Sequence, residues 1–137
     1  MAPAGNAGSY QITVHPDPTF TVPSNQSVCA GSLISATSLI SVPAGASYAW
    51  TNSNIAIGLA ANGTGNIPSF TALNSGSSQV STIITITPTL NGCIGNTASY
   101  TIIINPQPIV SVPASQAVCV GVTIAASSFT RDRKSVV

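Results

Sequence analysis

The chain has 137 residues, of which only 4% are charged, whereas about a quarter is usual for a soluble domain. Lys and Arg occur only at Arg131, Arg133 and Lys134, and the sole formal charge before them is Asp17. This composition excludes disorder driven by charge repulsion and a basic surface for nucleic acid. No apolar run approaches the ~18 residues of a membrane span. The opening MAPAGNAGSY lacks the basic start and apolar stretch of a signal peptide, which for an internal fragment says nothing of secretion.

Five segments have the residue pattern of β-strands. In chain order they are residues 32–40 (SLISATSLI), 45–52 (GASYAWTN), 66–74 (NIPSFTALN), 79–89 (QVSTIITITPT) and 99–105 (SYTIIIN). Side chains two residues apart share a face of a strand. The shared faces predicted in this way carry Tyr48 with Trp50, Phe70 with Ala72, and Tyr100 with Ile102 and Ile104. Apart from Ala72, we expect these residues in the core.

Turn sequences rich in Gly, Asn and Pro separate these segments: VPAGA, ANGTGN, LNSGSS and LNGCIGN. No stretch has the apolar period of a helix. Short strands at this spacing predict an all-β protein, an antiparallel β-sandwich of about seven strands.

The chain repeats itself with a period of 90 residues: Gly5 to Ser38 aligns without a gap on Gly95 to Ser128. The period suits one small sandwich, and a fixed period indicates an array of similar units. We therefore expect the end of one unit (1–15), a complete unit (16–105) and the start of a third (106–130), in a piece of a longer protein. Neighbouring repeats of the same chain are the first partners expected.

Both copies carry two prolines one residue apart at the start of a unit, HPDP and NPQP. Such prolines favour extended backbone and limit bending between successive domains. The alternative is an ordinary loop with prolines.

Each unit has one early and one late cysteine, because Cys119 is Cys29 one repeat later and Cys93 stands near the end of the unit. The even number per unit predicts a disulfide between Cys29 and Cys93, worth roughly 4 kcal/mol in the chain-entropy model. Two buried free thiols are the alternative. A metal site is disfavoured, since there is no CxxC pair and the one histidine, His15, lies at the joint.

The motifs VCAG, YAW, GTGNIPSFTA, NGC and NPQP together resemble the PKD-like, immunoglobulin-like repeats of Bacteroidota cell-surface and secreted proteins. The resemblance extends to about Thr130. It implies tandem sandwiches in an adhesin-type protein, a spacer or stalk outside the cell, with the early and late cysteines bridged. The Gly-Asp-Gly that usually follows the Tyr-x-Trp motif is replaced by TNSN, residues 51–54. The near absence of acidic residues leaves no ligands for a calcium site.

The last seven residues, RDRKSVV (131–137), break the pattern of the chain. We expect a non-native segment, since a common sequencing-adapter sequence encodes DRKSVV, or else a natural, solvated and disordered basic tail.

Three function classes follow, and a non-catalytic structural or adhesive repeat is favoured. A carbohydrate-binding or other accessory module of a secreted enzyme is the alternative, and it needs exposed aromatic residues; the glycan or protein ligand is not specified by the sequence. Seven aromatics exist: Tyr10, Phe20, Tyr48, Trp50, Phe70, Tyr100 and Phe129. An enzyme is disfavoured, because acid–base catalysis needs titratable groups within reach of one another and the unit offers only His15 and Asp17. No cofactor is expected.

Overall fold

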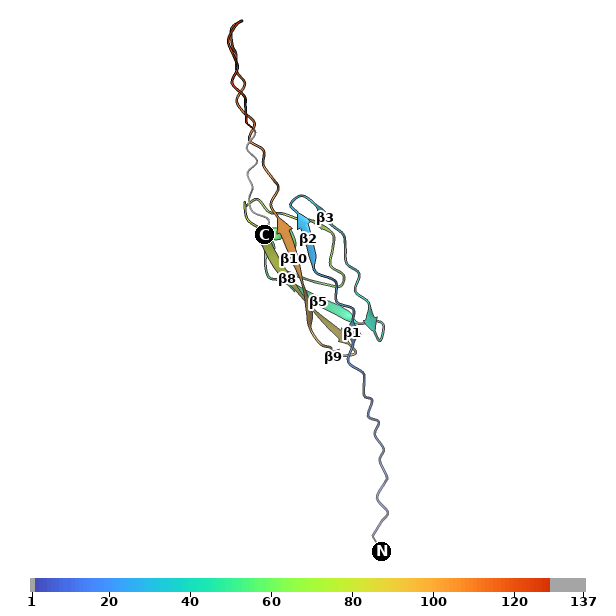
Figure 1. The fold of residues 1–137 in the computed structure, drawn as a ribbon. Helices are drawn as coiled ribbons and strands as arrows, with labels where there is room; N and C mark the ends of the chain where they lie inside the picture. The colour runs from blue at the N-terminus through green and yellow to red at the C-terminus, as the bar shows by residue number, and fades with distance from the viewer. Residues whose placement is uncertain (1, 129–137) are drawn as a thin grey trace.

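The structure is a computed structural model that describes residues 2–128, and it contains two β layers (Figure 1). The larger layer is a sheet with the strand order β2-β10-β8-β5-β6, and a short strand β9 extends the pairing of β8. Its strands are β2 (Gln26–Cys29), β5 (Ser47–Asn52), β6 (Asn62–Thr64), β8 (Val80–Leu90), β9 (Cys93–Ile94) and β10 (Ala98–Asn105).

The second layer consists of two short antiparallel pairs. Strand β1 (Thr19–Phe20) pairs with β4 (Ser41–Val42), and β3 (Leu33–Ile34) pairs with β7 (Phe70–Thr71). A single bridge joins Thr37 to Ile67 between them. One turn of 3-10 helix, η1 (Ile55–Ile57), follows β5. The all-β sandwich expected from the sequence is therefore the fold.

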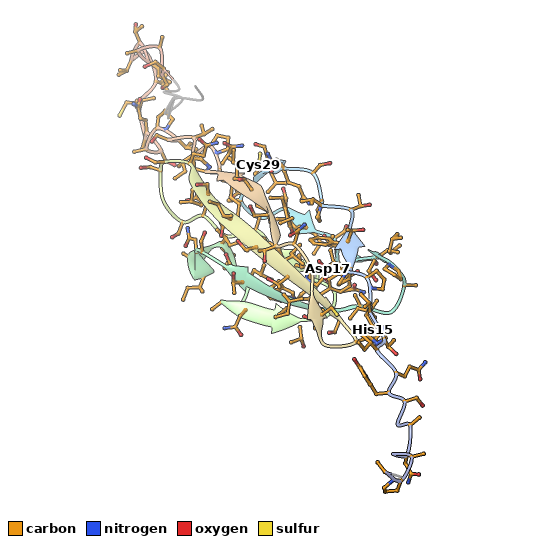
Figure 2. All side chains as sticks on the ribbon, turned by 90° about the horizontal axis from the view of Figure 1, so that it is seen from below. His15, Asp17 and Cys29 are labelled. Carbon is orange, nitrogen blue, oxygen red and sulfur yellow. The ribbon has the colours of Figure 1, made fainter. Side chains whose placement is uncertain are left out.

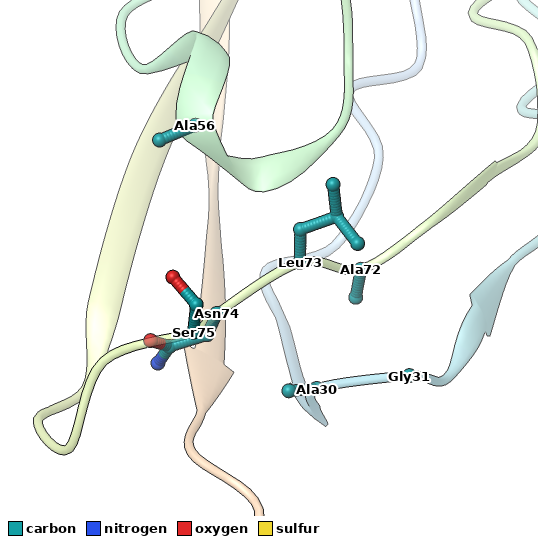
Figure 3. Close-up of a pocket in the computed structure, with 7 residues that line it drawn as sticks. All are labelled: Ala30, Gly31, Ala56, Ala72, Leu73, Asn74 and Ser75. Carbon is teal, nitrogen blue, oxygen red and sulfur yellow. The ribbon is translucent and has the colours of Figure 1, made fainter.

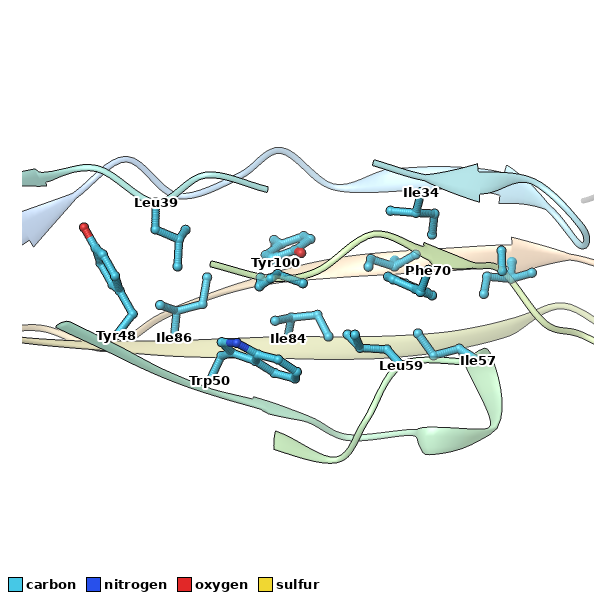
Figure 4. Packing of buried hydrophobic residues seen from close by; sticks show 14 residues of the cluster. Ile34, Leu39, Tyr48, Trp50, Ile57, Leu59, Phe70, Ile84, Ile86 and Tyr100 are labelled. Carbon is cyan, nitrogen blue, oxygen red and sulfur yellow. The ribbon is translucent and has the colours of Figure 1, made fainter. Parts of the chain in front are cut away.

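The core lies between the two layers, and Figure 4 shows its side chains reaching from β5, β8 and β10 toward the segments of the second layer. Burial alternates along each long strand, as it does along β8 from Val80 to Pro88. The residues expected in the core are all buried: Tyr48, Trp50, Phe70, Tyr100, Ile102 and Ile104. Alternation is thus the signal that places these side chains.

Three details differ from the sequence-based expectation. Strand β2 pairs with β10 in parallel, so the sandwich is not wholly antiparallel. Ten strands are present among residues 2–128 rather than about seven, because several are only two residues long. Residues 32–40, expected to be one strand, contribute only β3 and the bridge at Thr37. Alternation assigns faces of a strand, but it does not determine the direction or the length of its pairing.

A glycine lets β6 cross closely over the largest core side chain. Gly63 pairs with Trp50, and a Cβ atom at position 63 would overlap the Trp50 indole ring. Gly63 is the first glycine of the motif GTGNIPSFTA. The close approach explains why this position is a glycine, since any side chain there would displace the tryptophan.

Neighbouring isoleucines of β8 provide a matched test of the core. Ile84 is fully buried, whereas the side chain of Ile83 is 50% exposed. We expect Ile84→Ala to lower the free energy of unfolding by about 2–5 kcal/mol, because the truncation leaves a cavity. Ile83→Ala is the control and should cost far less. Chemical denaturation of both variants measures the difference, and equal losses would contradict the layer assignment.

Candidate functional site

The two ends of the sandwich are the sites to which the sequence pointed, because they hold the cysteines and the proline joints. The chain enters at the end where β1 and β9 lie and leaves at the end where β2 and β3 lie (Figure 1). Strand β10 connects one end to the other. With eight residues, it spans about 26 Å.

At the entry end, a tight hairpin turn presents Cys93. Asn91 and Gly92 both have positive φ, 50° and 80°, as a two-residue Asn-Gly turn requires. The turn joins Leu90 to Cys93, which are cross-strand partners. The Cys93 Sγ lies 4.0 Å from the backbone carbonyl oxygen of His15. The late cysteine therefore rests against the incoming chain.

The proline joint is also held at the entry end. Pro18 is fully buried, and a Cβ atom at Gly95 would overlap the Pro18 carbonyl group. The backbone N–H of Gly95 donates to the Pro88 carbonyl at 2.9 Å, which keeps the glycine in this position. The second proline of HPDP is thus part of the sandwich, and only the residues before it belong to the joint.

At the exit end, Asn105 closes the sheet beside the early cysteine. Cys29 and Asn105 are partners in the parallel pairing of β2 with β10. The backbone N–H of Ala30 donates to the Asn105 carbonyl oxygen at 2.8 Å. The Asn105 side-chain amide donates to the Ser27 hydroxyl at 3.2 Å. Strand β10 is therefore hydrogen bonded to β2 and the turn after it as far as its last residue, Asn105.

The turn after the early cysteine has the same form in both copies of the repeat. The backbone N–H of Ser32 donates to the Cys29 carbonyl at 3.1 Å, and that of Val122 donates to the Cys119 carbonyl at 3.3 Å. Gly31 and Gly121 have φ values of 85° and 90°. The glycine of VCAG and VCVG is required by this left-handed conformation.

A shallow pocket of about 330 Å³ lies beside this turn at the exit end (Figure 3). Its lining residues are Ala30, Gly31, Ala56, Ala72, Leu73, Asn74 and Ser75. The Asn74 side chain is hydrogen bonded within the unit: its amide donates to the carbonyl oxygens of Ser78 and Ile104, each at 2.9 Å. The lining consists of apolar and uncharged polar residues.

The structure does not contain the Cys29–Cys93 disulfide expected from the sequence. Both thiols are free, and so is that of Cys119. Figure 2 shows Cys29 at the opposite end from His15, the residue that Cys93 contacts. The length of β10 separates them, whereas a disulfide needs Cα atoms within about 7 Å. Counting the cysteines of a unit does not reveal which end of the sandwich each one occupies.

The family model of the PKD-like domain matches residues 26–108, which is more than half of the chain. The chain belongs to the PKD-like domain family. Neither the comparison with curated proteins nor the comparison with solved structures gave a match. Domains of this family are usually extracellular and structural, and they are typically non-catalytic. Among residues 2–128, no helix is long and apolar enough to cross a membrane.

The PKD-like domain does not present its aromatic residues as a binding platform. Tyr48, Trp50, Phe70 and Tyr100 are buried, and Phe20 packs edge-on against Tyr48 with ring centroids 5.8 Å apart. Tyr10 is 86% exposed but lies in the segment before the sandwich. Phe129 and the segment 131–137 lie outside the described residues. Among residues 2–128, Tyr10 is thus the one aromatic residue that is exposed.

Ionisable groups are equally sparse. Within residues 2–128, no group of three or more His, Cys, Asp or Glu side chains could hold a metal ion. His15 and Asp17 lie at the entry end of the domain (Figure 2). Burial raises the pKa of the Tyr100 hydroxyl, and a hydrogen bond with Thr37 opposes this effect. Tyr100 is a residue of the hydrophobic core.

A buried polar network, which the sequence analysis missed, holds the loop beside the pocket. The Thr82 hydroxyl donates to the side-chain oxygen of Asn52, and the Asn52 amide donates to the Leu59 carbonyl at 2.9 Å. The backbone N–H of Asn54 donates to the Asn52 side-chain oxygen at 3.0 Å. The only available signal was Asn52 itself, a polar residue in phase with Tyr48 and Trp50. Residues 51–54 (TNSN) stand where Gly-Asp-Gly usually follows the Tyr-x-Trp motif, and their asparagines anchor η1.

Two hydroxyl deletions should affect stability differently. Thr82→Val removes a bonded buried hydroxyl and should lower the free energy of unfolding by about 1–3 kcal/mol. Tyr48→Phe is the control, because the Tyr48 hydroxyl is buried without a hydrogen-bond partner. Its removal should leave stability unchanged or slightly higher. Denaturant midpoints at equal m-values measure both effects. A larger loss for Tyr48→Phe than for Thr82→Val would contradict this assignment.

Proposed function

We propose that this PKD-like domain is a spacer unit in a tandem array, part of the stalk of a large adhesin-type protein. The array lies outside the cell, of the kind found on Bacteroidota cell surfaces. The partners of each unit are the neighbouring repeats of the same chain. Its contribution is mechanical: each sandwich adds length and holds the next one in line.

The observation that supports the array best is the contrast between two copies of one strand. Tyr10, Ile12 and Val14 are 86%, 71% and 85% exposed. Their equivalents one repeat later are Tyr100 at 3% and Ile102 and Ile104 at 0%. The repeat positions that form the core of the complete unit are thus exposed in the segment that precedes it. A preceding sandwich of the same kind would cover all three.

The shortness of the joint supports end-to-end stacking. Asn105 is hydrogen bonded into the exit end of one unit, and Pro18, the equivalent of Pro108, is buried at the entry end. Only the positions of Pro106 and Gln107 lie between Asn105 and Pro108. Two residues, one of them proline, leave little length for one unit to swing against the next.

The lack of charge supports a spacer over a receptor-binding module. Tight, specific recognition by a small surface draws on aromatic and charged anchors. The unit buries four of its five aromatic side chains, Phe20 is partly buried, and residues 16–105 contain no Lys or Arg. Any adhesion should therefore be weak for one repeat and gain strength from many copies.

The array can be tested by small-angle X-ray scattering on chains with two, three and four copies of residues 16–105. The longest strand, β8, has 11 residues and spans about 36 Å. We therefore expect the maximum dimension to increase by about that length for each added unit. In a matched control, Pro16→Gly in every copy after the first replaces the proline that follows Asn105 at each joint, and it should allow bending and reduce the increase.

Two results would contradict the spacer. One is a maximum dimension that barely grows with copy number, because the units then fold back on each other. The other is tight binding of a defined glycan by one isolated unit in an array screen, which would support the accessory-module function instead.

A further inference from the structure

Each unit carries two thiols that it cannot join to each other, and both lie at a junction. Cys29 is exposed at the exit end and Cys93 is half-buried at the entry end. They are too far apart to react within one sandwich. Their positions become informative when the two ends are compared through the repeat.

His15 and Asn105 occupy the same position of the repeat, one period apart. His15 shows how this position contacts the entry end of the unit that follows it: the His15 carbonyl oxygen is 4.0 Å from the Cys93 Sγ. Asn105 shows how the same position contacts the exit end of its own unit: the Asn105 carbonyl oxygen accepts a hydrogen bond from the Ala30 N–H at 2.8 Å. In a continuous array, one residue has both roles at every junction.

In such an array, the Cys93 thiol of one unit and the Ala30 N–H beside Cys29 of the preceding unit would approach the same carbonyl oxygen. The Ala30 N–H reaches this oxygen from strand β2, and Cys29 immediately precedes Ala30. In the following unit, the equivalent of Cys93 reaches the same oxygen with its thiol. Both groups thus lie on the side of β10 to which the carbonyl points. Paired strands are about 4.8 Å apart, so Cys29 lies next to its partner Asn105, the residue whose carbonyl oxygen the second thiol approaches. This places the two cysteines as neighbours at the joint, and a disulfide needs their Cα atoms about 4.4–6.8 Å apart.

We propose that Cys29 of one unit forms a disulfide with the equivalent of Cys93 in the following unit. The bond joins successive sandwiches across the joint, and it rests on the tandem array proposed above. Cys119 occupies the position of Cys29 in the next copy, and the same turn follows both. It would bond with the late cysteine of the unit after its own.

The bond forms by thiol–disulfide exchange with a low-molecular-weight disulfide such as oxidised glutathione. The thiolate of one cysteine attacks the oxidant, forms a mixed disulfide and releases one glutathione thiolate. The thiolate of the second cysteine then displaces the other glutathione. The protein loses two protons and two electrons, and one glutathione disulfide becomes two glutathione molecules. Exposure of Cys29 gives the oxidant access to the first thiol.

A bond at this place would hold both sides of the joint. The chain already connects the units through Pro106 and Gln107, and a second covalent connection beside it removes most of the remaining hinge motion. The shallow pocket lined by Ala30 and Leu73 lies at the same end and offers an apolar surface to the following unit. The cysteines thereby serve the stiffness of the array rather than the stability of one sandwich.

The test uses a two-unit chain, residues 1–105 followed by residues 16–137. All strands and all core residues of the unit lie within 16–105, so the duplication keeps every pairing. In the junction variant, the only cysteines are Cys29 of the first unit and Cys93 of the second, and the others are changed to Ser. In the control, the only cysteines are Cys29 and Cys93 of the first unit.

Both variants are oxidised with glutathione disulfide at low protein concentration, and thiols and intact masses are then measured. We expect the junction variant to lose both thiols as a monomer, with a mass lower by two hydrogens. The control should keep two titratable thiols or carry glutathione adducts. Equal denaturation midpoints of the reduced variants establish that both are folded.

A junction variant that keeps its thiols, carries only adducts or forms only intermolecular dimers overturns the proposal, as does ring closure in the control. Failure here is distinguishable from failure of the spacer function. Scattering from reduced two-, three- and four-unit chains tests end-to-end stacking without any disulfide. A linear increase in length without a junction disulfide overturns the disulfide alone.

Discussion

The structure depends on strand β10, which is paired along both edges. It is antiparallel to β8 from Ala98 to Ile104 and parallel to β2 from Ile102 to Asn105. Its inner face buries Tyr100, Ile102 and Ile104 almost completely. Because this strand runs from the entry end to the exit end, it determines both the length of the unit and the separation of the places where the chain enters and leaves.

The placement of polar groups follows from the same core. Charge is nearly absent, so backbone and side-chain amides and hydroxyls must satisfy one another. Asn52 and Thr82 do so inside the sandwich, and Asn74 and Asn105 do so at its exit end. Side-chain amides can donate and accept at once, which suits loop anchors where no charged partner is available. The unit is thereby held together without ion pairs among its described residues.

The two ends of the sandwich carry the features on which the proposed array depends. One end holds the incoming proline and a half-buried thiol, and the other ends in a bonded asparagine, an exposed thiol and an apolar pocket. A two-residue joint brings such ends close in any array of these units. Membership in the PKD-like family agrees with a structural role.

The sequence by itself determined the β class, the faces of the long strands, the core aromatics and the repeat. These are local properties: alternation marks the buried face, Gly and Asn mark turns, and a fixed period needs no structure to be seen. Only the tertiary structure decided the parallel pairing of β2, the bonds of Asn52 and the place of each cysteine. Those depend on which distant segments meet, and Cys29 and Cys93 could be assigned to opposite ends only after β10 was seen to run between them.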